Sequence, residues 1–384
     1  MDMDSISRAF FSPDRPAGSS TIRRPGFSGF EDLSLSTRGI LGAGFREGQP
    51  PNREDAGADD IPGPLRGTCL DGNDCFIGEL YHEFGPSAHG GFVVAKPLRD
   101  CAAMLVFIEP MGRGPRAALT GAYLKGAVAG FLSSGAPDLA AKAPGSCLAR
   151  LDGMLESALN ELAIPGAMAT MSAVIVSAGD DRVTLLCRGT GGVAVVRSDG
   201  APAWMDGGGA PPFGVLPPGL MPPGFGLQDL MPGTAAPKPR TYTFAPGDTL
   251  VLANGQFDDV PGLDPIVAKG FVPVLAARAK SGGRFSAGGA TLVIPPPEAE
   301  SFAVPERMAV ALHALRLAGL KRNANEPRGT LILEPDQAAF FERICRASGL
   351  ELPASETVSK SCTSYIDAAP LDAKPLLAFS LRRI

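Results

Sequence analysis

The chain has 384 residues, enough for one large domain or two ordinary ones. Its formal net charge of -5 gives no reason to expect a nucleic-acid partner. Hydrophobic residues make up 45% of the chain and charged residues 20%, so a sizeable core can form, yet no apolar run is long enough to span a membrane.

The seven cysteines have no paired spacing and fit a reducing compartment better than a disulfide framework. Cys69 and Cys75 could form half of a zinc site, but no second half is found, and buried or unreactive thiols are the simpler interpretation. The acidic start, Met1 to Asp4, lacks the apolar core of a secretory signal. We therefore expect a cytoplasmic protein.

Residues 1–67 are rich in Pro, Gly, Ser, Arg and Asp and predict an irregular N-terminal arm. Two interpretations stay open. The arm is either a tail without fixed structure or a segment that binds in extended form along a partner protein. In the second case its phenylalanines would be the anchors: Phe10, Phe11, Phe27 and Phe30.

Residues 68–297 predict a domain of alternating strands and helices. Apolar runs predict strands at 91–95, 103–108, 169–176, 183–187, 193–197, 241–244, 249–253 and 290–294. Alanine- and leucine-rich stretches predict helices at 115–133, 146–162 and 263–280. Residues 178–181 and 189–192 are typical of hairpin turns. Residues 207–239, rich in Pro, Gly and Met, predict a surface insertion.

Residues 298–384 form a C-terminal appendix. The sequence predicts helices at 306–320 and 336–348 and strands at 330–334 and 376–381. This order indicates either a small α/β module or an extension of the main sheet.

Three phrases occur in a recognisable order. Leu105 to Gly114 (LVFIEPMGRG) is followed by an alanine-rich helix, Ala169 to Val176 opens the second half, and Phe244 to Leu252 leads into Asn254-Gly255. In order and spacing they resemble the bacterial SpoIIE-type branch of the metal-dependent (PPM) serine/threonine protein phosphatases, over about 60% of the chain. The resemblance implies an α/β sandwich of two central antiparallel sheets flanked by helices.

The resemblance also implies a reaction. In that family, carboxylates hold two Mn²⁺ or Mg²⁺ ions at the ends of the sheets, and a metal-activated water attacks a phosphoserine or phosphothreonine. An Asp-Gly pair lets the chain turn sharply, so that the carboxylate points at the ion.

This chain departs from the family pattern at each position. Glu79 stands at the metal-bridging place, His82 where an acid is frequent, Glu109 in place of an aspartate and Asn254 in place of another. At a fourth motif, Gly288-Gly289 stands where the family has an Asp-Asp pair. A glutamate reaches one methylene further, and an error of about 1 Å can cost on the order of a hundredfold in rate. These substitutions predict the loss of catalysis.

Other candidate sites have simpler explanations. Asp258 and Asp259 could rescue a metal site but fit a solvated loop, and the three histidines, at positions 82, 89 and 313, are too scattered for a metal site. At the start of the helix at 115–133, phosphate-binding candidates gather: Gly112, Arg113, Gly114 and Arg116.

Together these patterns predict a non-catalytic pseudophosphatase that acts as a protein-binding scaffold or assembly subunit, with no cofactor. Its contacts with protein partners would use the arm, the insertion at 207–239 and the appendix. Two alternatives stay open. One is an active phosphatase of a partner-switching pathway, with Mn²⁺ or Mg²⁺ held by Glu79 and Glu109. The other is a regulator that binds a phosphorylated protein.

Overall fold

The computed structural model describes residues 65–68, 74–83, 90–98, 101–162, 164, 166–189, 192–207, 210–214, 237–257, 265–297, 303–322, 328–370 and 375–384. The chain divides into two compact units, Met1–Ile61 and Pro62–Ile384, and every described residue belongs to the second. The predicted arm, including Phe10, Phe11, Phe27 and Phe30, therefore lies outside the described residues, apart from its last three positions.

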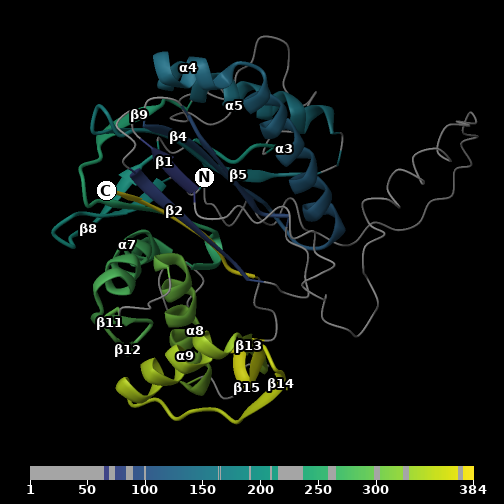
Figure 1. Ribbon diagram of the computed structural model, residues 1–384. Coiled ribbons are helices and arrows are strands. Elements are labelled where there is room, and N and C mark those ends of the chain that lie inside the picture. The colour runs from purple at the N-terminus through teal and green to yellow at the C-terminus, as the bar shows by residue number, and fades with distance from the viewer. Residues whose placement is uncertain are drawn as a thin grey trace, which may run out of the picture. The chain divides into compact units, whose positions relative to one another are not determined.

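Two antiparallel sheets form the centre of the second unit (Figure 1). One sheet has six strands in the order β1-β2-β16-β10-β7-β8: β1 (Leu65–Thr68), β2 (Asp74–His82), β16 (Leu377–Arg383), β10 (Thr249–Ala253), β7 (Gly192–Val196) and β8 (Pro202–Asp206). The other has five in the order β3-β4-β5-β6-β9: β3 (Phe92–Pro97), β4 (Ala102–Pro110), β5 (Ala169–Ser177), β6 (Arg182–Arg188) and β9 (Arg240–Thr243). The predicted sandwich is confirmed.

Helices cover the outer face of each sheet. The five-stranded sheet is covered by α3 (Pro115–Ser133), α4 (Ala136–Lys142) and α5 (Pro144–Glu161), and the six-stranded sheet by α7 (Pro265–Ser281) and α8 (Val304–Arg322) (Figure 1). Three hydrophobic clusters result, one between the sheets and one under each helical layer. Because β4 is covered on both faces, nearly all of its residues are buried, which explains its uninterrupted apolar sequence.

Local patterns located most elements well. The helix predicted at 115–133 has those bounds, with Pro115 in its first turn, and the leucines of α5 face the core. The turn at 178–181 joins β5 and β6 as a hairpin, as predicted. The hairpin predicted at 189–192 is wrong, because β6 and β7 lie in different sheets and this segment crosses between them.

The fourth motif lies away from both sheets. Gly288 and Gly289 form the turn of a separate two-stranded hairpin, β11 (Gly283–Ala287) and β12 (Ala290–Ile294), and both have a positive φ. The strand that lies between β2 and β10 is β16, from the end of the chain.

The C-terminal segment combines both of the predicted alternatives. β13 (Arg328–Leu333), β14 (Ser355–Ser359) and β15 (Cys362–Pro370) form a small sheet beside α9 (Pro335–Ala347), which resembles a separate module. β16 then extends the main sheet and pairs along its length with β2 and β10. Residues 62–384 form one compact unit.

The start of the predicted insertion packs into the core. Phe213 is fully buried against the helical layer of the five-stranded sheet, and its backbone pairs with Ala169. Most of residues 207–239 lie outside the described residues.

The expectation of reduced thiols is wrong for two cysteines. Cys75 and Cys101 are disulfide-bonded, whereas Cys147, Cys187, Cys345 and Cys362 are free. Cys69 lies outside the described residues, and a single further cysteine could not serve both bonded residues. Cys75 and Cys101 are therefore bonded to each other. Spacing gave no sign of this, because the bond joins strands of different sheets.

No helix within the described ranges is long and apolar enough to cross a membrane.

The packing of α3 beside the start of β3 depends on a close backbone contact between Gly121 and Gly90, and this contact can be tested by mutation. A Cβ added to Gly121 would lie 1.9 Å from the carbonyl oxygen of Gly90, whereas a Cβ on Gly126 would meet nothing within 4 Å. We expect Gly121→Ala to lower the free energy of unfolding by about 2–3 kcal/mol, because the helix must shift outward. The matched variant Gly126→Ala should raise it by up to about 1 kcal/mol, because alanine favours the helix. Urea unfolding measures both, and equal stability of the two variants would contradict the packing described.

Candidate functional site

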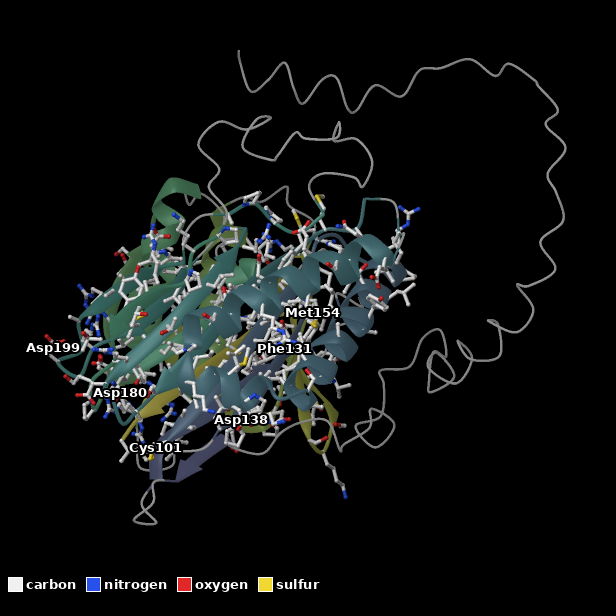
Figure 2. The ribbon with its side chains drawn as sticks, turned by 90° about the horizontal axis from the view of Figure 1, so that it is seen from above. Cys101, Phe131, Asp138, Met154, Asp180 and Asp199 are labelled. Carbon is white, nitrogen blue, oxygen red and sulfur yellow. The ribbon has the colours of Figure 1, made fainter. Side chains whose placement is uncertain are left out.

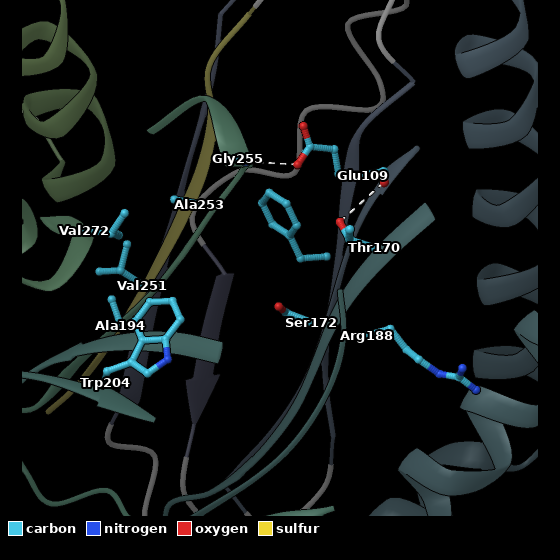
Figure 3. Close-up of a pocket in the computed structure, with 11 residues that line it drawn as sticks. Glu109, Thr170, Ser172, Arg188, Ala194, Trp204, Val251, Ala253, Gly255 and Val272 are labelled. Carbon is cyan, nitrogen blue, oxygen red and sulfur yellow. Dashed lines mark hydrogen bonds between the residues drawn. The ribbon is translucent and has the colours of Figure 1, made fainter. Parts of the chain in front are cut away.

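Glu109 and Gly255 join the two sheets at one end of the sandwich. Glu109 is the penultimate residue of β4, and Gly255 begins a short 3₁₀ turn, Gly255–Phe257, that follows β10. The Gly255 N–H donates to Glu109 Oε2 at 3.0 Å (Figure 3). The structure therefore brings the second and third family motifs together, as the resemblance predicts. One oxygen of the Glu109 carboxylate is engaged in this backbone contact.

Asn254 uses both ends of its side-chain amide on the C-terminal segment. Its Nδ2 donates to the Pro375 carbonyl at 3.0 Å, and its Oδ1 accepts from the Leu377 N–H at 3.3 Å. The residue is only 3% exposed, so these hydrogen bonds satisfy a buried amide. An aspartate could accept from Leu377 but could not donate to Pro375. The amide is therefore the group that this position requires.

Glu83 holds the same segment from the other side, and the sequence patterns did not single it out. Its backbone N–H donates to the Leu376 carbonyl, and its Oε2 accepts from the Leu376 N–H, each at 2.8 Å. Its Oε1 lies 3.0 Å from Nε2 of His313 on α8. Burial alone would raise the pKa of Glu83, but His313, the Leu376 N–H and Arg316 outweigh it and lower that pKa. Glu83 holds the segment before β16 only because the fold brings that distant part of the chain beside it, so its sequence neighbours do not indicate this contact.

Glu79 lies on the opposite face of its sheet from the sandwich interior. On β2, Phe76 and Leu80 face the other sheet, whereas Tyr81 packs in the cluster under α7 and α8. Side chains alternate along a strand, so Glu79 shares the face of Tyr81. It approaches Ser380 Oγ at 3.5 Å.

The pKa of a neighbouring acid supports this placement. Burial chiefly raises the pKa of Glu306 on α8, and the nearby charges of Glu334, Asp336 and Glu79 add to the effect. Glu79 therefore points toward the helical layer and is not gathered with Glu109.

These residues do not fit a two-metal site. Glu79 and Glu109 point to different places, and Asn254 offers one oxygen that already accepts a hydrogen bond. Among the described residues no three His, Cys, Asp or Glu side chains are close enough to hold a metal ion. Asp258, Asp259 and His89 lie outside the described ranges. His82 is the last residue of β2. His313, on α8, pairs with Glu83, which follows β2.

A small cavity of about 40 Å³ lies between the sheets beside Glu109 (Figure 3). Its polar lining residues include Thr170, Ser172 and Arg188. The Arg188 guanidinium points toward α5, where it forms hydrogen bonds of 2.7 and 2.8 Å with Asp152 (Figure 3). The arginine therefore ties α5 to the sheet and leaves the cavity without a free cation from this residue.

The phosphate-binding candidates do come together. Gly112, Arg113 and Arg116 line a cavity of about 120 Å³ with Ile164, Gly166 and Ala167. Gly114 is the N-cap of α3, with a φ of 77°. The arginines are exposed and stand beside the positive end of the helix dipole. Phosphate binding at this place stays a prediction.

A family model described as Stage II sporulation protein E (SpoIIE) matches residues 101–254. These residues, less than half of the chain, are therefore similar to the SpoIIE family, as the quoted phrases predict. No curated protein matches the chain.

Several solved structures are similar in shape at low identity. The RsbU and RsbW domains of Rv1364c from Mycobacterium tuberculosis share 13% identity at a TM-score of 0.45, covering 80% of this chain and 60% of that one. The SiaA-PP2C domain of Pseudomonas aeruginosa shares 13% at a TM-score of 0.37, covering 80% and 85%. The SpoIIE phosphatase domain with a regulatory fragment from Bacillus subtilis shares 10% at 0.40, covering 80% and 63%.

Proposed function

We propose that this chain is a pseudophosphatase, a SpoIIE-type domain that binds other proteins without hydrolysing phosphate esters. One observation supports this most strongly. Asn254 stands at a metal-ligand position of the family, and both its Nδ2 and its Oδ1 form hydrogen bonds that hold the start of β16. A site that serves as a structural joint cannot also rearrange around a metal ion without losing buried hydrogen bonds.

The proposal extends to a scaffold or assembly role for protein partners. The segments that would serve such contacts are the arm, the insertion at 207–239 and the appendix. Within the appendix, the small sheet of β13, β14 and β15 is separate from both main sheets, so a partner can bind there without disturbing the sandwich, whereas β16 and Phe213 are part of the sandwich itself. Of the five phenylalanines in the arm, the proposed anchors are Phe10, Phe11, Phe27 and Phe30.

Metal titration tests the non-catalytic role directly. Calorimetry of the full chain with Mn²⁺ should show no saturable binding of two ions, because the donors are separated or already hydrogen-bonded. A generic phosphate monoester should be hydrolysed no faster than in buffer with Mn²⁺ alone. Tight binding of two ions together with turnover would establish the alternative, an active phosphatase that uses Glu79 and Glu109.

The cavity at the start of α3 favours a second candidate function, the binding of a phosphorylated protein. Two exposed arginines and a helix N-terminus suit a phosphate group. The same calorimeter, loaded with a phosphoserine peptide and then with its unphosphorylated form, separates this function from the scaffold role. Phosphate-dependent binding that Arg113→Ser and Arg116→Ser abolish would favour the phosphoprotein reader.

A further inference from the structure

The disulfide joins the two sheets at a defined end of the sandwich. Cys75 is near the start of β2 in the six-stranded sheet, and Cys101 immediately precedes β4 in the five-stranded sheet. Both belong to the cluster of apolar side chains between the sheets. The bond is therefore a covalent link across the sandwich interior.

Noncovalent contacts surround the same link. The Ala178 N–H, in the β5–β6 turn, donates to the Cys101 carbonyl at 2.9 Å, and the Ile384 N–H donates to the Cys75 carbonyl at 3.0 Å. Figure 2 shows Cys101 at the same end of the sandwich as Asp180 of that turn. Arg383 reaches from β16 to the carbonyls of Ala178 and Phe244. The C-terminus and both sheets thus meet where the disulfide lies.

The backbone at Cys101 indicates that its sulfur matters. Its φ is 56°, in the left-handed region that suits glycine and asparagine better than other residues. A cysteine there is disfavoured unless its side chain contributes something that those residues cannot. A covalent bond across the core is such a contribution.

We infer that the Cys75–Cys101 disulfide is a structural crosslink, formed during folding, that holds the two sheets and the C-terminal strand together. Cys75 is 5% exposed and Cys101 9%. Redox-sensing cysteines are solvent-accessible and low in pKa, and these positions offer little access to an incoming thiolate. The crosslink is therefore maintained in the folded protein and does not act as a reversible sensor.

Its formation requires an oxidant, which we assign to the class of small-molecule or protein disulfides. The thiolate of one cysteine attacks the donor disulfide, forms a mixed disulfide and releases one donor thiol. The thiolate of the other cysteine then attacks the mixed disulfide and releases the second donor thiol. The two cysteines lose two electrons and two protons, and the donor becomes two thiols. The chain must therefore meet such a donor before its core closes, which an ordinary reducing cytoplasm does not favour.

Thiol counting with mapping tests the bond. The full chain is refolded with oxidised glutathione, denatured without reductant and titrated, and five of its seven cysteines should react. Cleavage before aspartate separates Cys69 from Cys75 at Asp71 and Asp74, and Cys75 from Cys101 at Asp100. Mass spectrometry should then find Cys75 linked to Cys101. Seven reactive thiols, or a link to Cys69, would overturn the inference.

The structural role is tested by stability and by reduction of the native protein. Cys101→Ser should lower the melting temperature by on the order of 5 °C, whereas Cys362→Ser, at a free and partly exposed thiol, should leave it unchanged. Cys101→Asn separates the effect of the sulfur from that of the backbone, because asparagine tolerates this φ. If Cys101→Asn is as stable as the natural chain, or if dithiothreitol reduces the native bond as fast as Cys362 is alkylated, the crosslink has no structural role.

Discussion

A chain that ends at Pro375 is expected to lose cooperative folding. The deletion removes β16 from the interior of the six-stranded sheet, where it pairs with both β2 and β10. Four large apolar side chains leave the core with it, each at most 2% exposed: Leu376, Leu377, Phe379 and Leu381. At about 1.5–3 kcal/mol for each buried side chain, the loss is comparable to the whole stability of a typical domain, about 5–15 kcal/mol.

Thermal unfolding followed by circular dichroism tests this prediction, and two point variants in the same segment give reference values for the loss of stability. Phe379→Ala, 2% exposed, should lower the free energy of unfolding by about 3–5 kcal/mol. Ile384→Ala, where the side chain is 54% exposed, should change it by less than about 0.5 kcal/mol. A synthetic peptide of residues 375–384 should restore a transition to the truncated chain. If the truncated chain melts like the full one without the peptide, β16 is not an integral strand.

The elements themselves were predictable because each carries its own periodicity. Pro115 and the alanines after it gave α3 its correct bounds, and the apolar run of 249–253 gave β10. The predictions that failed concern which strands pair with one another. The turn at 189–192 has the composition of a hairpin, but the chain crosses there to another sheet, a choice that only the packing of both sheets decides.

The candidate site shows the same limit. The resemblance implies that the second and third motifs lie at the ends of the sheets, and the Gly255 N–H does donate to Glu109. The resemblance puts Gly288-Gly289 where the family has an Asp-Asp pair before a strand, but in the structure this strand belongs to a separate hairpin, and the strand between β2 and β10 comes from 377–383. The backbone partners of Asn254 and Glu83 lie on that strand or just before it, so no local pattern could have indicated them.

Asn254→Asp is expected to destabilise the protein even though it restores the residue that the phosphatase family has at this position. The variant keeps the acceptor for the Leu377 N–H but sets a carboxylate oxygen against the Pro375 carbonyl, where Nδ2 now donates. A buried group that loses its donor and gains an unpaired charge costs about 2–4 kcal/mol. Urea unfolding at neutral pH measures this difference.

The pH dependence of the variant identifies the cause. In the folded variant the buried carboxyl introduced at position 254 can donate to Pro375 only when protonated, so its pKa should rise above the unfolded value of about 3.9. The variant should therefore be closest to the natural chain below that pH, and the difference should grow as the pH rises toward neutrality. Asn160→Asp makes the same chemical change at an exposed residue of α5, and it should cost on the order of 0.5 kcal/mol.

Asn254→Asp also tests why the candidate site would not bind metal. Either the change at residue 254 alone prevents binding, or the remaining carboxylates no longer point at one place. If Asn254 alone prevented metal binding, Asn254→Asp would bind Mn²⁺, and the ion would stabilise it against unfolding. We expect neither effect, because Glu79 faces the helical layer and Glu109 is tied to Gly255. Mn²⁺-dependent stabilisation of Asn254→Asp, absent in Asn160→Asp, would show that the remaining carboxylates still converge. In that case a single substitution at position 254 would restore metal binding, and the structural role proposed for Asn254 would be wrong.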